Sequence, residues 1–109
     1  MKKILHRKIC ITGATSGIGY QAIINLINQG HDLSILCRNV NRAEYLLNSL
    51  KRDNILESFI QKHISIYIAD LSDINSVDEF IKLFISKNIF IDTLILNAGL
   101  QYTGAKNIT

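Results

Sequence analysis

The chain has 109 residues, 48% of them hydrophobic and 19% charged, and its formal net charge at pH 7 is +3. This length and composition indicate one modest globular domain, or part of one, and exclude a multidomain protein. No apolar run reaches the roughly 18 to 20 residues that span a bilayer, and the basic start leads into too short an apolar stretch for a signal peptide, so we expect a cytoplasmic protein.

The first predicted elements are a strand at residues 7–12 and a helix at residues 20–29, with a glycine-rich turn between them. The strand is almost continuously apolar, as a strand covered on both faces of a sheet requires. The helix has an apolar stripe at helical spacing, formed by Ala22, Ile23, Leu26 and Ile27. Gly30 follows at the position where glycine commonly ends a helix.

A second strand is predicted at residues 32–37, followed by a second helix. Either Asn39 or Asn41 can cap this helix, whose apolar stripe consists of Ala43, Leu46, Leu47 and Leu50. The pattern at residues 54–63 leaves two interpretations open, a continuation of the helix or a connecting loop.

A third strand is predicted at residues 64–69 and a fourth at residues 92–97. The helix between them has the stripe Val77, Phe80, Ile81, Phe84 and Ile85. Its predicted cap is Ser72 or Ser76, and residues 76–79 match a capping box.

The alternation of four strands with helices predicts right-handed crossovers and a parallel sheet of the α/β class. The fourth strand is expected on the other side of the first, which gives the order 3-2-1-4 of a doubly wound, Rossmann-type sheet. No linker or repeat divides residues 1–109, so we expect part of a single domain. In such sheets ligands bind at the carboxyl ends of the strands.

The turn after the first strand has the sequence Thr-Gly-Ala-Thr-Ser-Gly-Ile-Gly at residues 12–19. Because Gly13, Gly17 and Gly19 have no Cβ, the backbone can turn tightly and approach a ligand closely. The first unpaired N–H groups of the following helix point at that ligand. This combination predicts a bound pyrophosphate, and hence a dinucleotide.

The second strand ends in Cys37-Arg38-Asn39, where an NAD-preferring site would place an acid for the ribose 2′-hydroxyl. Arg38 instead suits a 2′-phosphate, since a guanidinium group can hold phosphate bidentately and a carboxylate would repel it. We therefore favour NADP over NAD. The alternative interpretation makes Arg38 a solvated surface residue.

The third strand is followed by Asp70 and the fourth by Asn97-Ala98-Gly99. The carboxylate of Asp70 can accept from the exocyclic amine of adenine, and the small residues 98 and 99 let backbone lie against the adenosine half. The alternatives are a helix cap for Asp70 and a strand-ending turn for residues 97–99. Their placement at successive strand ends favours the nucleotide.

Because these motifs follow successive predicted strands, the chain resembles the short-chain dehydrogenase/reductase family. The marks of that family are Thr-Gly-x-x-x-Gly-x-Gly, an Asp after the third strand, and Asn-Asn-Ala-Gly after the fourth. Residues 12–19, Asp70 and residues 97–99 match, and Leu96 stands in place of the first Asn of the last motif. The strand endings at residues 37–39 and 97–100 look most like the branch that contains retinol dehydrogenases and protochlorophyllide reductases.

The resemblance implies a role for each matching position. The residues that would line the cofactor phosphates are Gly13, Thr15, Ser16, Gly17, Ile18 and Gly19. Those that would hold the 2′-phosphate are Arg38 and Asn39, and those that would flank adenine are Asp70 and Leu71. Those that would lie against the adenosine half are Asn97, Ala98 and Gly99.

The resemblance covers only the first half of the family's fold, so we expect the catalytic half to be absent. Members of the family use a serine after a fifth strand and a Tyr-x-x-x-Lys pair on the next helix, where the spacing brings both side chains to one face. Tyr102 and Lys106 have that spacing, but they lie in a loop-like tail that contains Gly104 and follows no such strand. We predict no catalytic residue in this chain.

Other chemistries have little support in the sequence. Cys10 and Cys37 are predicted to be reduced core thiols. The three histidines are scattered without cysteine or carboxylate at ligand spacing, so no metal site is expected. The basic residues are spread out and lack interleaved aromatics, which disfavours nucleic acid as a partner.

The leading hypothesis is therefore the NADP-binding half of a short-chain oxidoreductase that is inactive alone, whether through truncation or a split gene. The rival hypothesis is a non-enzymatic nucleotide-binding or interaction module, or one subunit that pairs with a separately encoded catalytic half. Self-association through an exposed fourth strand is a related expectation, because unpaired strand edges associate. A product that never folds stably is the third interpretation.

Overall fold

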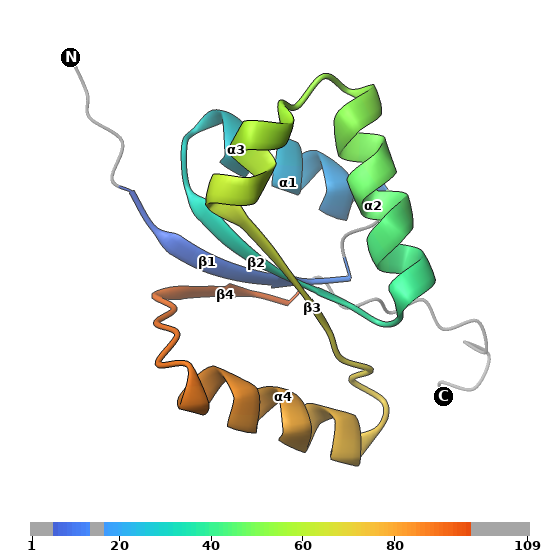
Figure 1. Cartoon of the computed structure of the whole chain (residues 1–109), viewed down its shortest axis with the longest axis vertical. Helices are drawn as coiled ribbons and strands as arrows, with labels where there is room; N and C mark the ends of the chain where they lie inside the picture. Colours follow the sequence, from blue (N-terminus) through green and yellow to red (C-terminus); the bar gives the residue numbers. More distant parts are fainter. Residues whose placement is uncertain (1–5, 14–16, 97–109) are drawn as a thin grey trace.

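The computed structural model describes residues 6–13 and 17–96. The elements in chain order are β1 (Lys8–Thr12), α1 (Gly17–Asn28), β2 (Asp32–Cys37), α2 (Val40–Arg52), α3 (Glu57–His63), β3 (Ile64–Ile68), α4 (Ile74–Ser86) and β4 (Thr93–Ile95). The strands form one parallel sheet in the order β3-β2-β1-β4 (Figure 1). The predicted α/β class, parallel sheet and strand order are confirmed.

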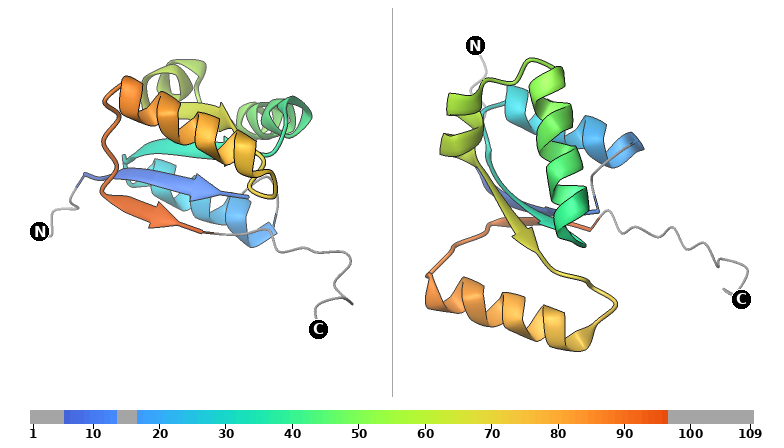
Figure 2. Two further views of the ribbon diagram at one scale, coloured as in Figure 1. Left: turned by 90° about the horizontal axis from the view of Figure 1, so that it is seen from below. Right: turned by 45° about the vertical axis from the view of Figure 1, so that its right-hand side comes forward.

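The helices lie in two layers on either side of this sheet. Figure 2 shows α1, α2 and α3 on one face and α4 alone on the other. The main core lies between the sheet and the first layer, and its most deeply buried side chains are Ile11, Ile23, Ile35, Leu46 and Leu50. On the other face, α4 has no buried residue.

The rings of Tyr67, Phe80 and Phe84 join α4 to the sheet. Tyr67 on β3 meets both phenylalanines edge to face, with ring centroids 5.8 and 5.0 Å apart. The two phenylalanine rings lie 4.3 Å from each other. Long aromatic side chains therefore bridge the space between helix and sheet.

Three helices end with the same backbone motif. In each, the residue after the C-cap has a left-handed φ: +85° at Gly30 after α1, +68° at Asn54 after α2 and +53° at Asn88 after α4. Its N–H and the next N–H bond back to the last turn, as when Gly30 bonds to Ile27 and His31 to Leu26. The predicted cap at Gly30 is confirmed, and asparagine does the same at the other two ends because it tolerates this conformation.

The ambiguous segment 54–63 divides at this turn. Asn54 ends α2, and the short helix α3 occupies Glu57–His63. The expected continuation of α2 is therefore wrong, and the expected connecting loop is correct only for the first residues, since a separate helix follows the turn.

The predicted cap of α4 is wrong. The helix begins at Ile74, and its N-cap is Asp73, whose side chain accepts from the backbone N–H of Asn75. Ser76 lies inside the first turn, and its hydroxyl accepts from the backbone N–H of Asp70 at 2.9 Å. The hydroxyl that was predicted to cap the helix therefore closes the loop before it.

The other predicted cap agrees with the structure, because Asn39 caps α2. The fourth strand is shorter than predicted, and Asn97 at its predicted end lies outside the described residues. Within residues 6–13 and 17–96, no helix combines the length and the apolarity that a membrane span needs.

Candidate functional site

The carboxyl ends of the strands meet at one edge of the sheet. Thr12 of β1 lies opposite Leu36 of β2, and Cys37 of β2 lies opposite Ile68 of β3. The pairing continues one step further, since the N–H of Ala69 donates to the carbonyl of Cys37 at 2.9 Å. The segments that begin at Gly13, Arg38 and Asp70 therefore leave the sheet side by side.

The glycine-rich turn joins β1 to α1 at this edge. Gly13 and Gly17 have φ values of +60° and +64°, a region that side chains other than glycine rarely adopt. A Cβ added at Gly17 would meet nothing within 4 Å, so backbone conformation, not lack of space, accounts for this glycine. The predicted phosphate-binding residues Thr15 and Ser16 lie outside the described part of the chain.

The start of α1 presents its backbone to the same edge. Gly19 is buried where the helix meets the sheet, whereas the side chain of Ile18 is 86% exposed. The first N–H groups of a helix have no partner within the helix, and the helix dipole makes this end attractive to anions. The sequence places three glycines here, and two of them, Gly13 and Gly17, have left-handed backbone conformations in the structure.

Arg38 and Asn39 follow β2 and are both exposed. The Oδ1 atom of Asn39 accepts from the backbone N–H of Arg42 at 2.9 Å, which caps α2. Its side chain is thus partly engaged by the helix. Within the described residues no carboxylate lies within 4.0 Å of the Arg38 guanidinium, which leaves that group available to an anionic ligand.

Asp70 is held in one orientation after β3. Its Oδ1 atom accepts from the hydroxyl of Ser72 at 2.7 Å and from the N–H of the same residue at 3.0 Å. These hydrogen bonds lower the pKa of Asp70, and the positive charge of Arg38 lowers it further. The carboxylate is therefore ionised at neutral pH, with Leu71 beside it 51% exposed.

The edge contains one cation that the sequence analysis did not single out. Arg42 lies in the first turn of α2, and its charge acts on the thiol of Cys37 at the end of β2. Arg42 could have been found from its position three residues after the cap Asn39, because residues about one helical turn apart lie on the same side of a helix. Arg38 and Arg42 make this corner of the edge positive.

The two thiols are part of the core. Cys10 and Cys37 are free and buried, and burial raises the pKa of both. At Cys37 this effect exceeds the opposing charge of Arg42, so the thiol stays protonated at neutral pH. Across the residues with a described placement, no three potential metal ligands gather.

β4 pairs with the other side of β1, with Ile95 opposite Ile11, so it ends at the same edge. The predicted residues that follow it, Asn97, Ala98 and Gly99, lie outside the described residues, as do Tyr102 and Lys106.

Comparison with known proteins decides the family, because the model of the short chain dehydrogenase family matches residues 7–109. The chain belongs to the short-chain dehydrogenase family. It is 35% identical over 99 residues to the short chain dehydrogenase rstn4 of Aspergillus nomiae, which covers 88% of this chain and 25% of that protein. It is 27% identical over 95 residues to human retinol dehydrogenase 13, covering 87% of this chain and 27% of that protein.

A solved structure agrees with this assignment. The chain is similar to YwfH, an NADPH-dependent reductase involved in bacilysin biosynthesis, with 26% identity and a TM-score of 0.63. That match covers 86% of this chain and 38% of the other. The chain thus spans about a quarter of the length of the two curated relatives. The family and the Rossmann-type fold predicted from the sequence are confirmed.

Proposed function

We propose that residues 1–109 form the N-terminal, NADP-binding portion of an oxidoreductase whose catalytic half lies outside this sequence. The observation that supports this most directly is that three segments meet at one edge of the sheet. They are the glycine-rich turn after β1, the corner after β2 that contains Arg38 and Arg42, and Asp70 after β3. A dinucleotide carries phosphates, a ribose and adenine in that order, and this edge offers a complementary group for each. A cytoplasmic location stays a prediction.

Each group at the edge has a distinct part in binding. The phosphates would bind the backbone of Gly13, Thr15, Ser16, Gly17, Ile18 and Gly19. The oriented carboxylate of Asp70 would accept from the adenine amine, with Leu71 packing on the ring and residues 97–99 against the adenosine half. When bound, the nicotinamide cofactor supplies the hydride, and the residues of this chain bind and orient it.

The preference for NADP depends on the corner after β2. No acid stands at residues 37–39, and Arg38 and Arg42 both lie at this corner, where we propose that the 2′-phosphate binds. Asn39, engaged as the helix cap, would contribute its remaining amide hydrogens. Charge-assisted hydrogen bonds to phosphate are about twice as strong as neutral ones, so this corner would discriminate by charge.

The variant Arg38→Asp tests this preference. We expect it to weaken NADPH binding by at least about tenfold, since one charge-assisted bond is worth roughly 1.5–3 kcal/mol. NADH, without the 2′-phosphate, should lose little. The matched control is Lys82→Asp, which makes the same charge change on the exposed side of α4. Equal losses for both cofactors, measured by fluorescence titration, would remove Arg38 from the 2′-phosphate site.

The second half of the proposal concerns a partner. α4 has an exposed apolar stripe at helical spacing, with Ile74, Ile81 and Ile85 exposed by 79%, 47% and 70%. Leu94 on the edge strand β4 is 59% exposed as well. Because the relatives are more than three times as long as this chain, we propose that a separately encoded or downstream catalytic half covers this isoleucine stripe and the edge of β4.

Coexpression with a downstream reading frame that carries a serine and Tyr-x-x-x-Lys tests the partner. The proposal predicts copurification and NADPH-dependent carbonyl reduction by the pair but not by this chain alone. Self-association through β4 is the competing outcome, and light scattering of the isolated chain detects it. A concentrated sample that stays monomeric, and that binds no such partner, would contradict both.

A further inference from the structure

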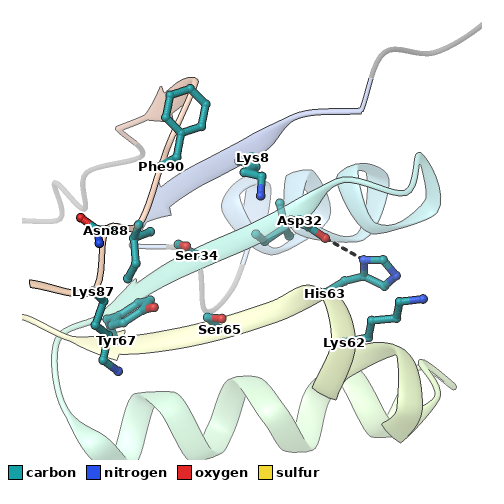
Figure 3. A pocket seen from close by; sticks show the side chains of 12 residues that line it. Lys8, Asp32, Ser34, Lys62, His63, Ser65, Tyr67, Lys87, Asn88 and Phe90 are labelled. Atoms are coloured by element: carbon teal, nitrogen blue, oxygen red, sulfur yellow. Dashed lines mark hydrogen bonds and ion pairs between the residues drawn. The ribbon is translucent and has the colours of Figure 1, made fainter. Parts of the chain in front are cut away.

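A polar hollow of about 330 Å³ lies on the α4 face of the sheet, toward the amino ends of the strands. Lys8 and Asp32, the first residues of β1 and β2, line it, whereas the proposed cofactor edge lies at the carboxyl ends. Figure 3 shows Ser34 and Ser65 in its middle, Lys87 and Asn88 at one end, and His63 at the other. The hollow is therefore separate from the dinucleotide site.

The lining is rich in positive charge. Three lysines contribute to it: Lys8 from β1, Lys62 from α3, and Lys87 from the end of α4. In the described part of the chain, none of these ammonium groups has a carboxylate within 4.0 Å. The one carboxylate in the lining, Asp32, already accepts from His63 at 2.7 Å and from His6 at 3.2 Å.

The floor of the hollow carries hydroxyl donors where a helix-covered sheet would usually be apolar. Ser34 and Ser65 are paired residues of β2 and β3, so their side chains emerge next to each other on the same face. Neither hydroxyl has a hydrogen-bond partner among residues 6–13 and 17–96. The amide of Asn88 adds a further donor at the rim.

We propose that this hollow binds a phosphate group, either as free phosphate or on a small phosphorylated metabolite. Ammonium groups and hydroxyls offer donors from several directions, and the unprotonated, negatively charged oxygens of a phosphate accept such hydrogen bonds. Three uncompensated ammonium groups raise the local concentration of such an anion.

The test is a titration of the ¹⁵N-labelled 109-residue chain with inorganic phosphate, with ionic strength held constant by sodium chloride. We expect saturable shifts at the amides of Ser34, His63, Ser65 and Asn88. Shifts confined to Gly13, Gly17 and Gly19 would instead report phosphate in the cofactor loop and would overturn the proposal. Repeating the titration with glycerol phosphate distinguishes the two possible ligands. Tighter binding of glycerol phosphate indicates a phosphate ester, and tighter binding of inorganic phosphate indicates free phosphate.

Paired variants separate a site from a general charge effect. The double variant Lys62→Gln with Lys87→Gln should weaken phosphate binding at least tenfold. The control, Lys51→Gln with Lys82→Gln, removes the same charge from lysines that are paired with Glu57 and Asp78 outside the hollow. It should leave the affinity within twofold. An equal loss in both double variants, or no saturable shift in the folded chain, would overturn the proposal.

Discussion

The two faces of the sheet differ in how completely they are covered. On the side of α1, α2 and α3, Ile11, Ile23 and Ile35 are each 0% exposed. On the side of α4, no helix residue is buried and an isoleucine stripe faces outward. Since burial of apolar surface is the dominant favourable term in folding, the stability of this chain comes mainly from the first face. The second face is where further polypeptide can add to it.

The largest expected effect comes from the same substitution made on each face. Ile35→Ala should lower the free energy of unfolding by roughly 2 to 5 kcal/mol, because it leaves a cavity in a closed core. Ile85→Ala, at a side chain that is 70% exposed, should lower it by less than about 1 kcal/mol. Urea unfolding of both variants measures the difference. Similar losses would show that α4 packs as tightly as the other helices.

The two ends of α1 permit a second comparison, at Gly17 and Gly30. Both have left-handed φ values, and at neither would a Cβ meet an atom within 4 Å. Replacement by alanine should therefore cost about 1–2 kcal/mol of backbone strain at each. Only Gly17→Ala should also weaken NADPH binding, by about tenfold, because only Gly17 lies in the proposed phosphate-binding loop. An unchanged affinity would show that this loop does not contact the cofactor.

The smallest expected effect lies at the amino ends of the strands, at Asp32. Burial raises the pKa of this carboxyl, but the hydrogen bonds from His63 and His6 outweigh it and lower the pKa overall. A pKa that is lower in the folded state stabilises the fold above the unfolded value of about 3.9. That contribution is lost as the pH falls through the folded value.

Asp32→Asn should therefore flatten the fall of the unfolding free energy between about pH 5 and pH 3. Urea unfolding at several pH values, with the unaltered chain measured in parallel, gives this slope. A variant whose acid dependence matches that of the unaltered chain would show that the histidine contacts do not stabilise the folded state.

The sequence predicts best what local pattern decides. The alternation of apolar runs placed β2 at residues 32–37, and the structure has the same bounds. The strand ends then met as predicted, because parallel strands with short connections place their carboxyl ends at one edge. The arginine after β2 and Asp70 after β3 could for this reason be located from the amino-acid pattern alone.

Features that depend on competition or on distant residues were not predictable. Asp73 and Ser76 are both good cap residues three positions apart, and only the loop at Asp70, which engages Ser76, decides between them. Seven residues are too few for the pattern of α3 to be distinguished from a loop. Lys8 and Lys87 both line the polar hollow, although they lie far apart in the sequence, and only the tertiary fold brings such distant positions together.

The proposed function depends above all on dinucleotide binding at the carboxyl edge of the sheet. Calorimetric titration of the folded 109-residue chain with NADPH tests this binding without any catalytic readout. We expect saturable binding of one NADPH per chain, with weaker binding of NADH. A chain that shows cooperative unfolding but gives no binding heat with NADPH at several temperatures would contradict the proposed function.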